Sequence, residues 1–448
     1  MKRFFKSDFI KLFKLSTPIM IGMLMQSLFS MVDLYFVAKL GTEEAAAASL
    51  GGSAFWTMIS ITVLVTSATM AIIARAKGAE DTQTIKAFGS LTSILSVILG
   101  LGLGLVLKTY QTGIITFLYN PNPVTLNLIS AYLNVLFGGY VVFFVSSNGR
   151  SIVQALGDTM TPLIVFGGAN VLNMVLDPLL IFTFDMGIMG AALATVIANL
   201  IACIVIYSII IKRLYGGKIS EFLTSATFKV KALYDIFKIG SWDLLQAVAR
   251  PITGMMMFRM VLNIGGPPAT AAFGIGGQLF NYTFIILVGL SMSISIMTGQ
   301  SLGKGDADAV KRLMKESFLV AGINMLLFAI PYLLLAEGIF RFFRNDPGII
   351  LNGVTYLRWV YPGVIFVIFP MIFGGIFKGA GATREPMVAS MVANVALKLP
   401  LAYILAYKTP MGISGIWLAI SLSVVIEALI ISLYFKKGRW QQIKAYTT

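Results

Sequence analysis

Twelve long segments with few or no charged residues constrain this chain more than any other feature of its sequence. A helix needs about 20 apolar residues to cross the hydrocarbon core of a bilayer. Backbone groups in lipid must find their partners within the spanning structure, which favours helices. The sequence therefore predicts an all-α integral membrane protein with twelve transmembrane helices. The expected spans are residues 15–38, 48–74, 87–107, 127–149, 160–184, 187–211, 239–262, 270–298, 317–336, 351–376, 386–407 and 412–435.

The composition excludes several classes of function. The chain has no His and a single Cys, Cys203, which lies in an apolar run. A disulfide framework, a Cys/His zinc site, haem ligation by His and Ser-His-Asp chemistry all lack their parts. The spans also contain no metal cluster and no nucleophile–base pair, which argues against an integral-membrane enzyme. We expect no cofactor.

The distribution of basic residues indicates the orientation. With twelve spans both termini lie on one side, and 25 of the 34 Lys and Arg residues fall on that side, against six on the opposite side. Cytoplasmic loops are enriched in Lys and Arg. We therefore expect a multi-pass protein of the cell (inner) membrane with both termini cytoplasmic. This bias also explains the net charge of +15, so no nucleic-acid partner is needed.

The two halves of the chain resemble each other at an offset of about 224 residues. Residues 78–81 correspond to 303–306, 154–159 to 378–383, and 187–190 to 412–415. Six spans per repeat give both copies the same topology, with a pseudo-twofold axis along the membrane normal. Transporters place their substrate sites between such repeats. We predict two six-helix bundles in a monomer: an N-lobe (1–214), a cytoplasmic linker (215–236) and a C-lobe (237–448).

Two acidic residues lie at a similar depth within the first bundle. Asp33 is near the outer end of span one, and Asp177 is near the outer end of span five. Thr195, on the returning span six, reaches the same depth at 1.5 Å per residue. A charged side chain within a span costs at least about 2.5 kcal/mol on insertion scales, so such residues indicate function.

Amides and a freed carbonyl accompany the second acid. Asn170 and Asn173 lie seven and four residues before Asp177, on the same helix face. Pro178 has no N–H, so the Met174 carbonyl is free to accept a bond. These oxygen donors suit a hard monovalent cation or a proton. The alternative interpretation is structural, with Asp and Asn bonding neighbouring helices.

These motifs resemble those of the multidrug and toxic compound extrusion (MATE) family. The resemblance rests on Asn173-x-x-x-Asp177-Pro178, on residues 187–195 (Gly-x-x-Gly-Ala-Ala-x-Ala-Thr) and on Asp33 within residues 31–35. It covers the whole chain and implies export of organic cations and drugs in exchange for Na⁺ or H⁺. It also implies that Asp33, Asn173, Asp177 and Thr195 bind the coupling ion, with Na⁺ as a candidate metal.

The second bundle departs from one branch of that family. Members of this branch carry acidic ligands on helices seven and ten, whereas this chain has Arg250 near the first position and no acid in span ten. Spans seven and eleven instead carry Arg250 and Lys398. Either these bases face the substrate cavity, which would favour an anionic or zwitterionic part in the substrate, or they pair within the C-lobe with Asp243, Glu427 or backbone carbonyls. The residues we assign to the substrate cavity are Gln26, Asn148, Asn170, Arg250 and Lys398.

The predicted function is therefore secondary active export of small molecules, expected to be organic cations and drugs, by cation antiport with alternating access. A flippase of lipid-linked saccharide precursors is the alternative, because a more basic cavity would suit it. The sequence decides neither the natural substrate nor the choice between Na⁺ and H⁺.

Overall fold

The computed structural model describes residues 2–441, which are helical almost throughout and contain no strand. The helices longer than one turn are α1 (Lys2–Ala38), α2 (Thr42–Ile59), α3 (Val63–Gly78), α4 (Thr82–Tyr119), α5 (Pro123–Gly138), α6 (Tyr140–Ala155), α7 (Met160–Pro178), α8 (Gly187–Leu214), α9 (Ile219–Thr224), α10 (Val230–Gly303), α11 (Ala307–Leu334), α12 (Ala336–Phe343), α13 (Pro347–Val364), α14 (Ile368–Ala380), α15 (Arg384–Met391), α16 (Lys398–Tyr407) and α17 (Ile413–Lys436). Two π-helical turns, η2 (Leu179–Thr183) and η4 (Val392–Leu397), continue α7 and join α15 to α16.

These helices make up the twelve predicted spans. Ten helical runs in the described residues are long and apolar enough to cross a membrane, and the pair α5 and α6, bent by 51°, can form another. The 74-residue α10 contains two spans, because Gly266 breaks it with φ 64°. That break falls between the expected spans 239–262 and 270–298. The predicted fold class is confirmed.

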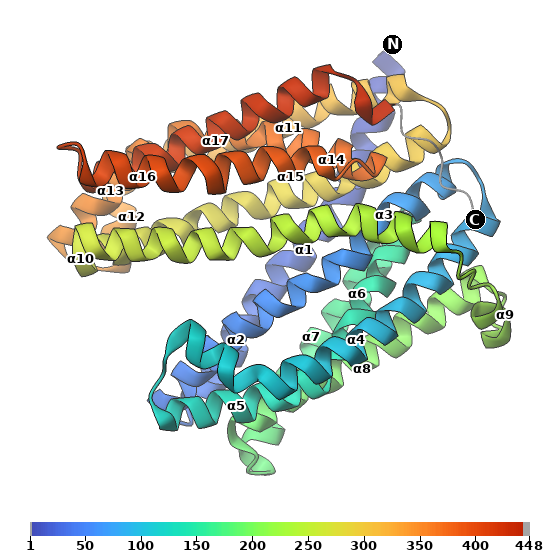
Figure 1. The fold of residues 1–448 in the computed structure, drawn as a ribbon, viewed down its shortest axis with the longest axis horizontal. Coiled ribbons are helices and arrows are strands. Elements are labelled where there is room, and N and C mark those ends of the chain that lie inside the picture. Colours follow the sequence, from blue (N-terminus) through green and yellow to red (C-terminus); the bar gives the residue numbers. More distant parts are fainter. Residues whose placement is uncertain (1, 442–448) are drawn as a thin grey trace. The chain divides into compact units, whose positions relative to one another are not determined.

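The contacts divide the chain into two units, one of which contains residues 17–240. Within it α4, α5, α6 and α8 pack against one another (Figure 1). The segment expected to be a linker, 215–236, carries α9, which is fixed to α4. Lys86 Nζ lies 2.7 Å from Glu221 Oε1, and the Ser90 hydroxyl donates to the Phe222 carbonyl. Among the described residues, the other unit contains 241–441 together with the first turns of α1.

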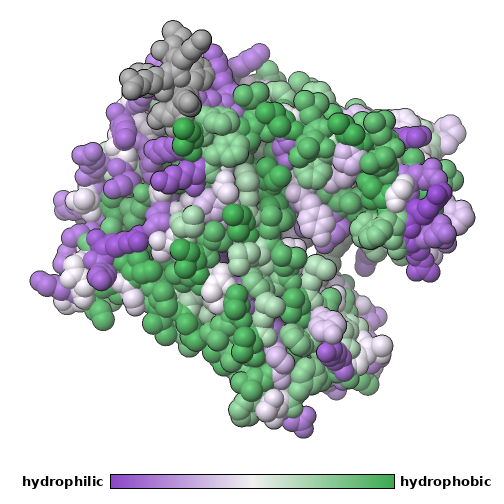
Figure 2. Space-filling model, turned by 180° about the vertical axis from the view of Figure 1, so that it is seen from behind, coloured by the Kyte–Doolittle hydropathy of each residue, from purple (hydrophilic) through white to green (hydrophobic). Residues whose placement is uncertain are grey.

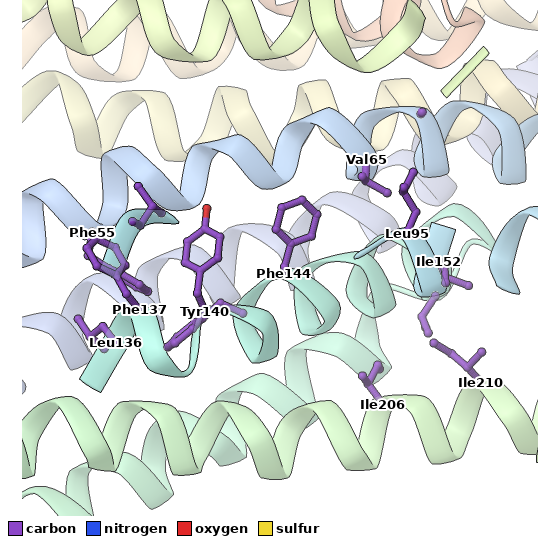
Figure 3. Close-up of a cluster of buried hydrophobic side chains, with 14 of the residues drawn as sticks. Phe55, Val65, Leu95, Leu136, Phe137, Tyr140, Phe144, Ile152, Ile206 and Ile210 are labelled. Carbon is purple, nitrogen blue, oxygen red and sulfur yellow. The ribbon is translucent and has the colours of Figure 1, made fainter. Parts of the chain in front are cut away.

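Aliphatic side chains form most of the core of the first unit, and a group of aromatic rings packs among them (Figure 3). The Phe55 and Phe143 rings lie 4.9 Å apart, centroid to centroid, in an edge-on arrangement. The Tyr140 hydroxyl donates to the Met58 carbonyl at 2.7 Å, which satisfies a polar group within the core. At Gly100 in α4 an added Cβ would lie 2.8 Å from the Val141 Cα, so α4 and α6 pack backbone to backbone. This packing holds α6 in a fixed position beside the polar cavity described below.

The internal repeat is confirmed by the helix ends. Gly187 and Gly412 share φ 53°, and Gly157 and Gly381 have φ 93° and 80°. Positive φ is costly for residues with a Cβ, so the repeated glycines mark repeated turns. Residues 81 and 306 are both Asp, and each caps the helix that follows it by accepting a bond from a backbone N–H three residues on.

Apolar side chains cover the sides of the helices, and hydrophilic ones gather at the helix ends (Figure 2). Large apolar residues are exposed along α4, α11 and α17, including Leu105 (68%), Leu326 (69%) and Leu433 (60%). A soluble protein rarely exposes apolar surface on this scale. Lipid is the solvent that fits these faces, so the chain is a multi-pass membrane protein.

Candidate functional site

A polar cavity of about 150 Å³ lies inside the first unit. Six helices of that unit line it: α1, α2, α5, α6, α7 and α8. Its charged lining residues are Asp33 and Arg150. Its other lining residues are Gln26, Phe29, Ser30, Gly52, Phe55, Trp56, Ile59, Tyr132, Leu136, Phe143, Ser146, Ser147, Asn170, Asn173, Thr195, Ala198 and Asn199.

The two predicted acids meet at one end of this cavity. Asp33 of α1 lines it, and Asp177 of α7 lies directly behind with no exposed surface. The two carboxyl groups lie close enough to interact electrostatically. Asp33 Oδ1 and Asp177 Oδ2 are both buried without a donor. Two carboxylates close together repel each other unless a proton or a cation lies between them.

The predicted amide and hydroxyl lie beside this pair. Asn173 Nδ2 donates to Asp177 Oδ1 at 3.1 Å, which leaves the Asn173 carbonyl oxygen toward the cavity it lines. Thr195 Oγ1 donates to the Ala191 carbonyl at 3.0 Å, so its lone pairs are available. The structure thus brings Asp33, Asn173, Asp177 and Thr195 together within one lobe, as the sequence predicts. Their role in ion binding stays a prediction.

The backbone around Asp177 is irregular for identifiable reasons. Pro178 ends α7, since it cannot donate to the helical ladder, and η2 follows it. Such π-helical turns are frequent at functional sites. Gly190 of α8 allows close packing on η2, because a Cβ there would lie 2.8 Å from the Leu180 carbonyl carbon. Thr195, farther along α8, lines the same cavity as Asp33.

Of the predicted cavity residues in the N-lobe, Gln26 and Asn170 line the cavity. The assignment of Asn148 is wrong. Its side chain is fully buried, it accepts from the Thr69 hydroxyl at 2.7 Å and its amide contacts Thr92 and Ser93. It therefore faces α3 and α4, while its neighbours Ser147 and Arg150 face the cavity.

Lys398 and Arg250 belong to the second unit, where Lys398 takes part in a short polar chain. Lys398 Nζ donates to Asn394 Oδ1 at 2.9 Å, and Asn394 Nδ2 donates to Glu427 Oε2 at 2.9 Å. Lys398 is half-buried, whereas Arg250 is exposed. The two bases are near enough to repel each other.

Asp243 does not pair with either of these bases. Its Oδ1 lies 2.9 Å from Lys378 Nζ, and its side chain is 3% exposed. Asp243 is therefore a buried partner of Lys378, and its interpretation as a pairing residue for Arg250 or Lys398 is wrong.

Sequence reasoning missed two residues of the cavity. The tally of basic residues places Arg150 in a cytoplasmic loop after span four, but α6 continues to Ala155 and keeps Arg150 inside the bundle. The residues that usually end a helix could have revealed that Arg150 is helical, because the first such residue after it is Gly157. Tyr132 lies close enough to both acids to interact with their charges. Nothing in its position in the sequence distinguishes it from other aromatic residues.

Comparison with known proteins agrees with this architecture. The sequence profile of the MatE family matches residues 18–179 and 245–404, one segment in each half. The chain belongs to the MatE family. The two matched segments follow the repeat, and together they contain Asp33, Asp177, Arg250 and Lys398.

Several known proteins are similar to this MatE chain over nearly its full length. The probable multidrug resistance protein NorM of Thermotoga maritima is 24% identical, over 96% of this chain and 93% of that protein. The FAD transporter of Shewanella oneidensis is 27% identical, over 97% and 96%. The solved outward-facing structure of a multidrug resistance MATE transporter of the MOP superfamily superposes with a TM-score of 0.88 at 22% identity, covering 98% of this chain and 97% of that one.

Proposed function

We propose that this MatE protein is a secondary active exporter of small molecules, driven by a cation that enters the N-lobe at Asp33 and Asp177. One observation carries the proposal: two acidic side chains from different helices lie close together, and each keeps a buried oxygen without a donor. A purely structural pair would be satisfied by neighbouring donors, because an unsatisfied buried polar atom costs about 1–3 kcal/mol. A cation that enters the site would give the unpaired carboxylate oxygens a partner.

A proton is the ion that the geometry favours. One proton shared by the carboxyl groups turns their repulsion into a hydrogen bond, and a second would neutralise the pair. Release requires only that water reaches Asp33, which already lines the cavity. The Asp177 carboxyl would then follow through its interaction with Asp33.

Na⁺ is the second candidate, because the same residues offer oxygen ligands. Both carboxylates, the Asn173 carbonyl oxygen and the Thr195 hydroxyl are of the hard type that alkali cations prefer. The Asn173 amide already holds Asp177 through its nitrogen, so its oxygen is available. A sodium ion would replace the shared proton at the same position.

We propose further that the exported molecules are organic cations or drugs, that the protein acts as a monomer in the cell membrane and that both termini are cytoplasmic. Support comes from the names of the multidrug relatives, from Asp33 in the cavity lining and from the bias in basic residues. Exchange of the ion for the substrate follows if the N-lobe cannot hold both at once, because each needs a different charge on the acidic pair. Loading the ion would then release the substrate, and the reverse.

Ion-gradient-driven uptake of ethidium by proteoliposomes tests the proposal. Vesicles receive a pH gradient at constant Na⁺, a Na⁺ gradient at constant pH, or neither. Uptake with the pH gradient alone supports the proton, and uptake with the Na⁺ gradient alone supports sodium. Equal rates in all three conditions would contradict antiport and favour a flippase or a passive pathway.

A further inference from the structure

Arg150 is a cationic side chain without a counter-ion inside the N-lobe cavity. Its Nε is buried and has no hydrogen-bond partner, and no described residue forms an ion pair with it. Its guanidinium carbon lies 3.8 Å from the centroid of the Phe166 ring. The proposed transport reaction uses the acids and leaves this charge unexplained.

Stacking on Phe166 does not by itself account for a half-buried arginine whose Nε is fully buried. A cation–π contact contributes about 0.5–2 kcal/mol, whereas taking one ion out of water costs several kcal/mol. The ring lies against the guanidinium carbon and accepts no ordinary hydrogen bond from the N–H groups, so these remain available. A guanidinium presents a planar fork that matches a carboxylate or a phosphate.

The surroundings of Arg150 suit the rest of such a ligand. Asn170 and Ser147 add polar groups to the lining, and Trp56 adds a large aromatic surface. A cavity of about 150 Å³ is the size that accommodates a benzene-sized group. Asp33 is the other charged residue of the lining, so the cavity carries both signs of charge.

We propose that Arg150 binds an anionic group, such as a ring carboxylate, of the molecule that this protein transports. The inference rests on the proposed function, since it names a chemical class for the cargo of the same cavity. It changes the expected cargo from purely cationic molecules to molecules that carry both charges. Arg150 specifies the anionic end, and the acids at Asp33 and Asp177 remain responsible for coupling.

Equilibrium binding of rhodamine 110 and rhodamine 123 tests this proposal. The two dyes share one cationic ring system, and rhodamine 123 is the methyl ester of the benzoate that rhodamine 110 carries free. Fluorescence polarisation with purified protein in detergent measures both affinities without any ion gradient. In Arg150→Gln we expect rhodamine 110 to bind about ten- to a hundredfold more weakly, the value of a charged hydrogen bond. Rhodamine 123 should bind several-fold more tightly, because a repelling charge is gone.

Two further variants make the result decisive. Arg150→Lys keeps the charge and should retain part of the preference for rhodamine 110. Lys212→Gln removes one positive charge at the exposed end of α8 and should leave the ratio of the two affinities as in the wild type. An unchanged ratio in Arg150→Gln, or equal weakening of both dyes, would overturn the proposal. Because no gradient is applied, a protein that fails to transport but shows the shifted ratio would contradict the proposed function and not this inference.

Discussion

Each lobe contains an Asn side chain hydrogen-bonded to a charged side chain four residues later, and the charge is negative in one lobe and positive in the other. In the N-lobe, Asn173 donates to Asp177 four residues later at 3.1 Å. In the C-lobe, Asn394 accepts from Lys398 four residues later at 2.9 Å. An amide can do either, because it has both a donor and an acceptor. A π-helical turn accompanies each pair, η2 after Asp177 and η4 before Lys398.

The lobes differ in whether the charge is balanced. Asn394 turns its nitrogen to Glu427 at 2.9 Å, so the C-lobe contains base, amide and acid in one chain. The N-lobe has two acids close together, and each keeps an oxygen without a donor. In the C-lobe chain the acid and the base balance each other, whereas the acidic pair of the N-lobe has no cation beside it among the described residues. This difference supports our proposal that the coupling ion binds in the N-lobe.

The strongest test of this difference is Asp177→Asn against Lys398→Gln. We expect the first to reduce gradient-driven export to the level of protein-free vesicles, because the neutral amide cannot exchange an ion. Lys398→Gln should keep coupled export, although at a lower rate. Uptake of ethidium under a pH or Na⁺ gradient measures both, at equal amounts of reconstituted protein. Coupled export by Asp177→Asn at the wild-type rate would contradict an N-lobe ion site.

A double mutant sharpens the interpretation of the acidic pair. If Asp33 and Asp177 hold one ion together, Asp33→Asn alone should be as damaging as Asp177→Asn, and the double variant should be no worse than either. Residual export rates near the detection limit of the same assay would be compared over long times. Losses that multiply would indicate two separate ion sites.

The sequence could predict some features of the fold and of the site but not others. The spans and the repeat were predictable, since the length and apolarity of a segment and a constant offset between two halves can be read without knowing how the helices pack. Asp33 and Asp177 were found because a charge within a span is costly anywhere in it. Arg150 was missed because it lies at a predicted span end, where a long basic side chain can reach water cheaply. Asn148 was misplaced because the helix face that meets α3 and α4 is polar too, with Thr69, Thr92 and Ser93.

A smaller effect is expected from the bases of the C-lobe. Arg250 is exposed, and none of the hydrogen bonds or ion pairs found among the described residues involves it, so it is a better probe than Lys398. Arg250→Gln should change the preference between rhodamine 110 and rhodamine 123 a few-fold toward the cation, and leave the ion dependence of export unchanged. Rates for both dyes under one fixed gradient measure this. A loss of folded protein without a change of preference would instead assign Arg250 a structural role.

The smallest expected effect comes from Gly190 and Gly415, which occupy equivalent places in the two halves and let a helix pack closely on the segment before it. A Cβ at Gly190 would lie 2.8 Å from the Leu180 carbonyl carbon, and one at Gly415 would lie 2.6 Å from that of Leu405. Overpacking of this kind costs about 1–3 kcal/mol, so both Gly→Ala variants should melt at a lower temperature than the wild type in detergent.

Their transport should differ even though their stability does not. Leu180 belongs to η2, directly after Asp177, so Gly190→Ala displaces the backbone that carries the ion-binding acid. It should therefore raise the ion concentration that gives half-maximal export. Gly415→Ala acts on α16 and should lower the melting temperature alone. Gly102→Ala, where an added Cβ meets nothing within 4 Å, is the matched control. Equal shifts in ion dependence for the two repeat variants would mean that both lobes take part in coupling, against the contrast drawn from their charges.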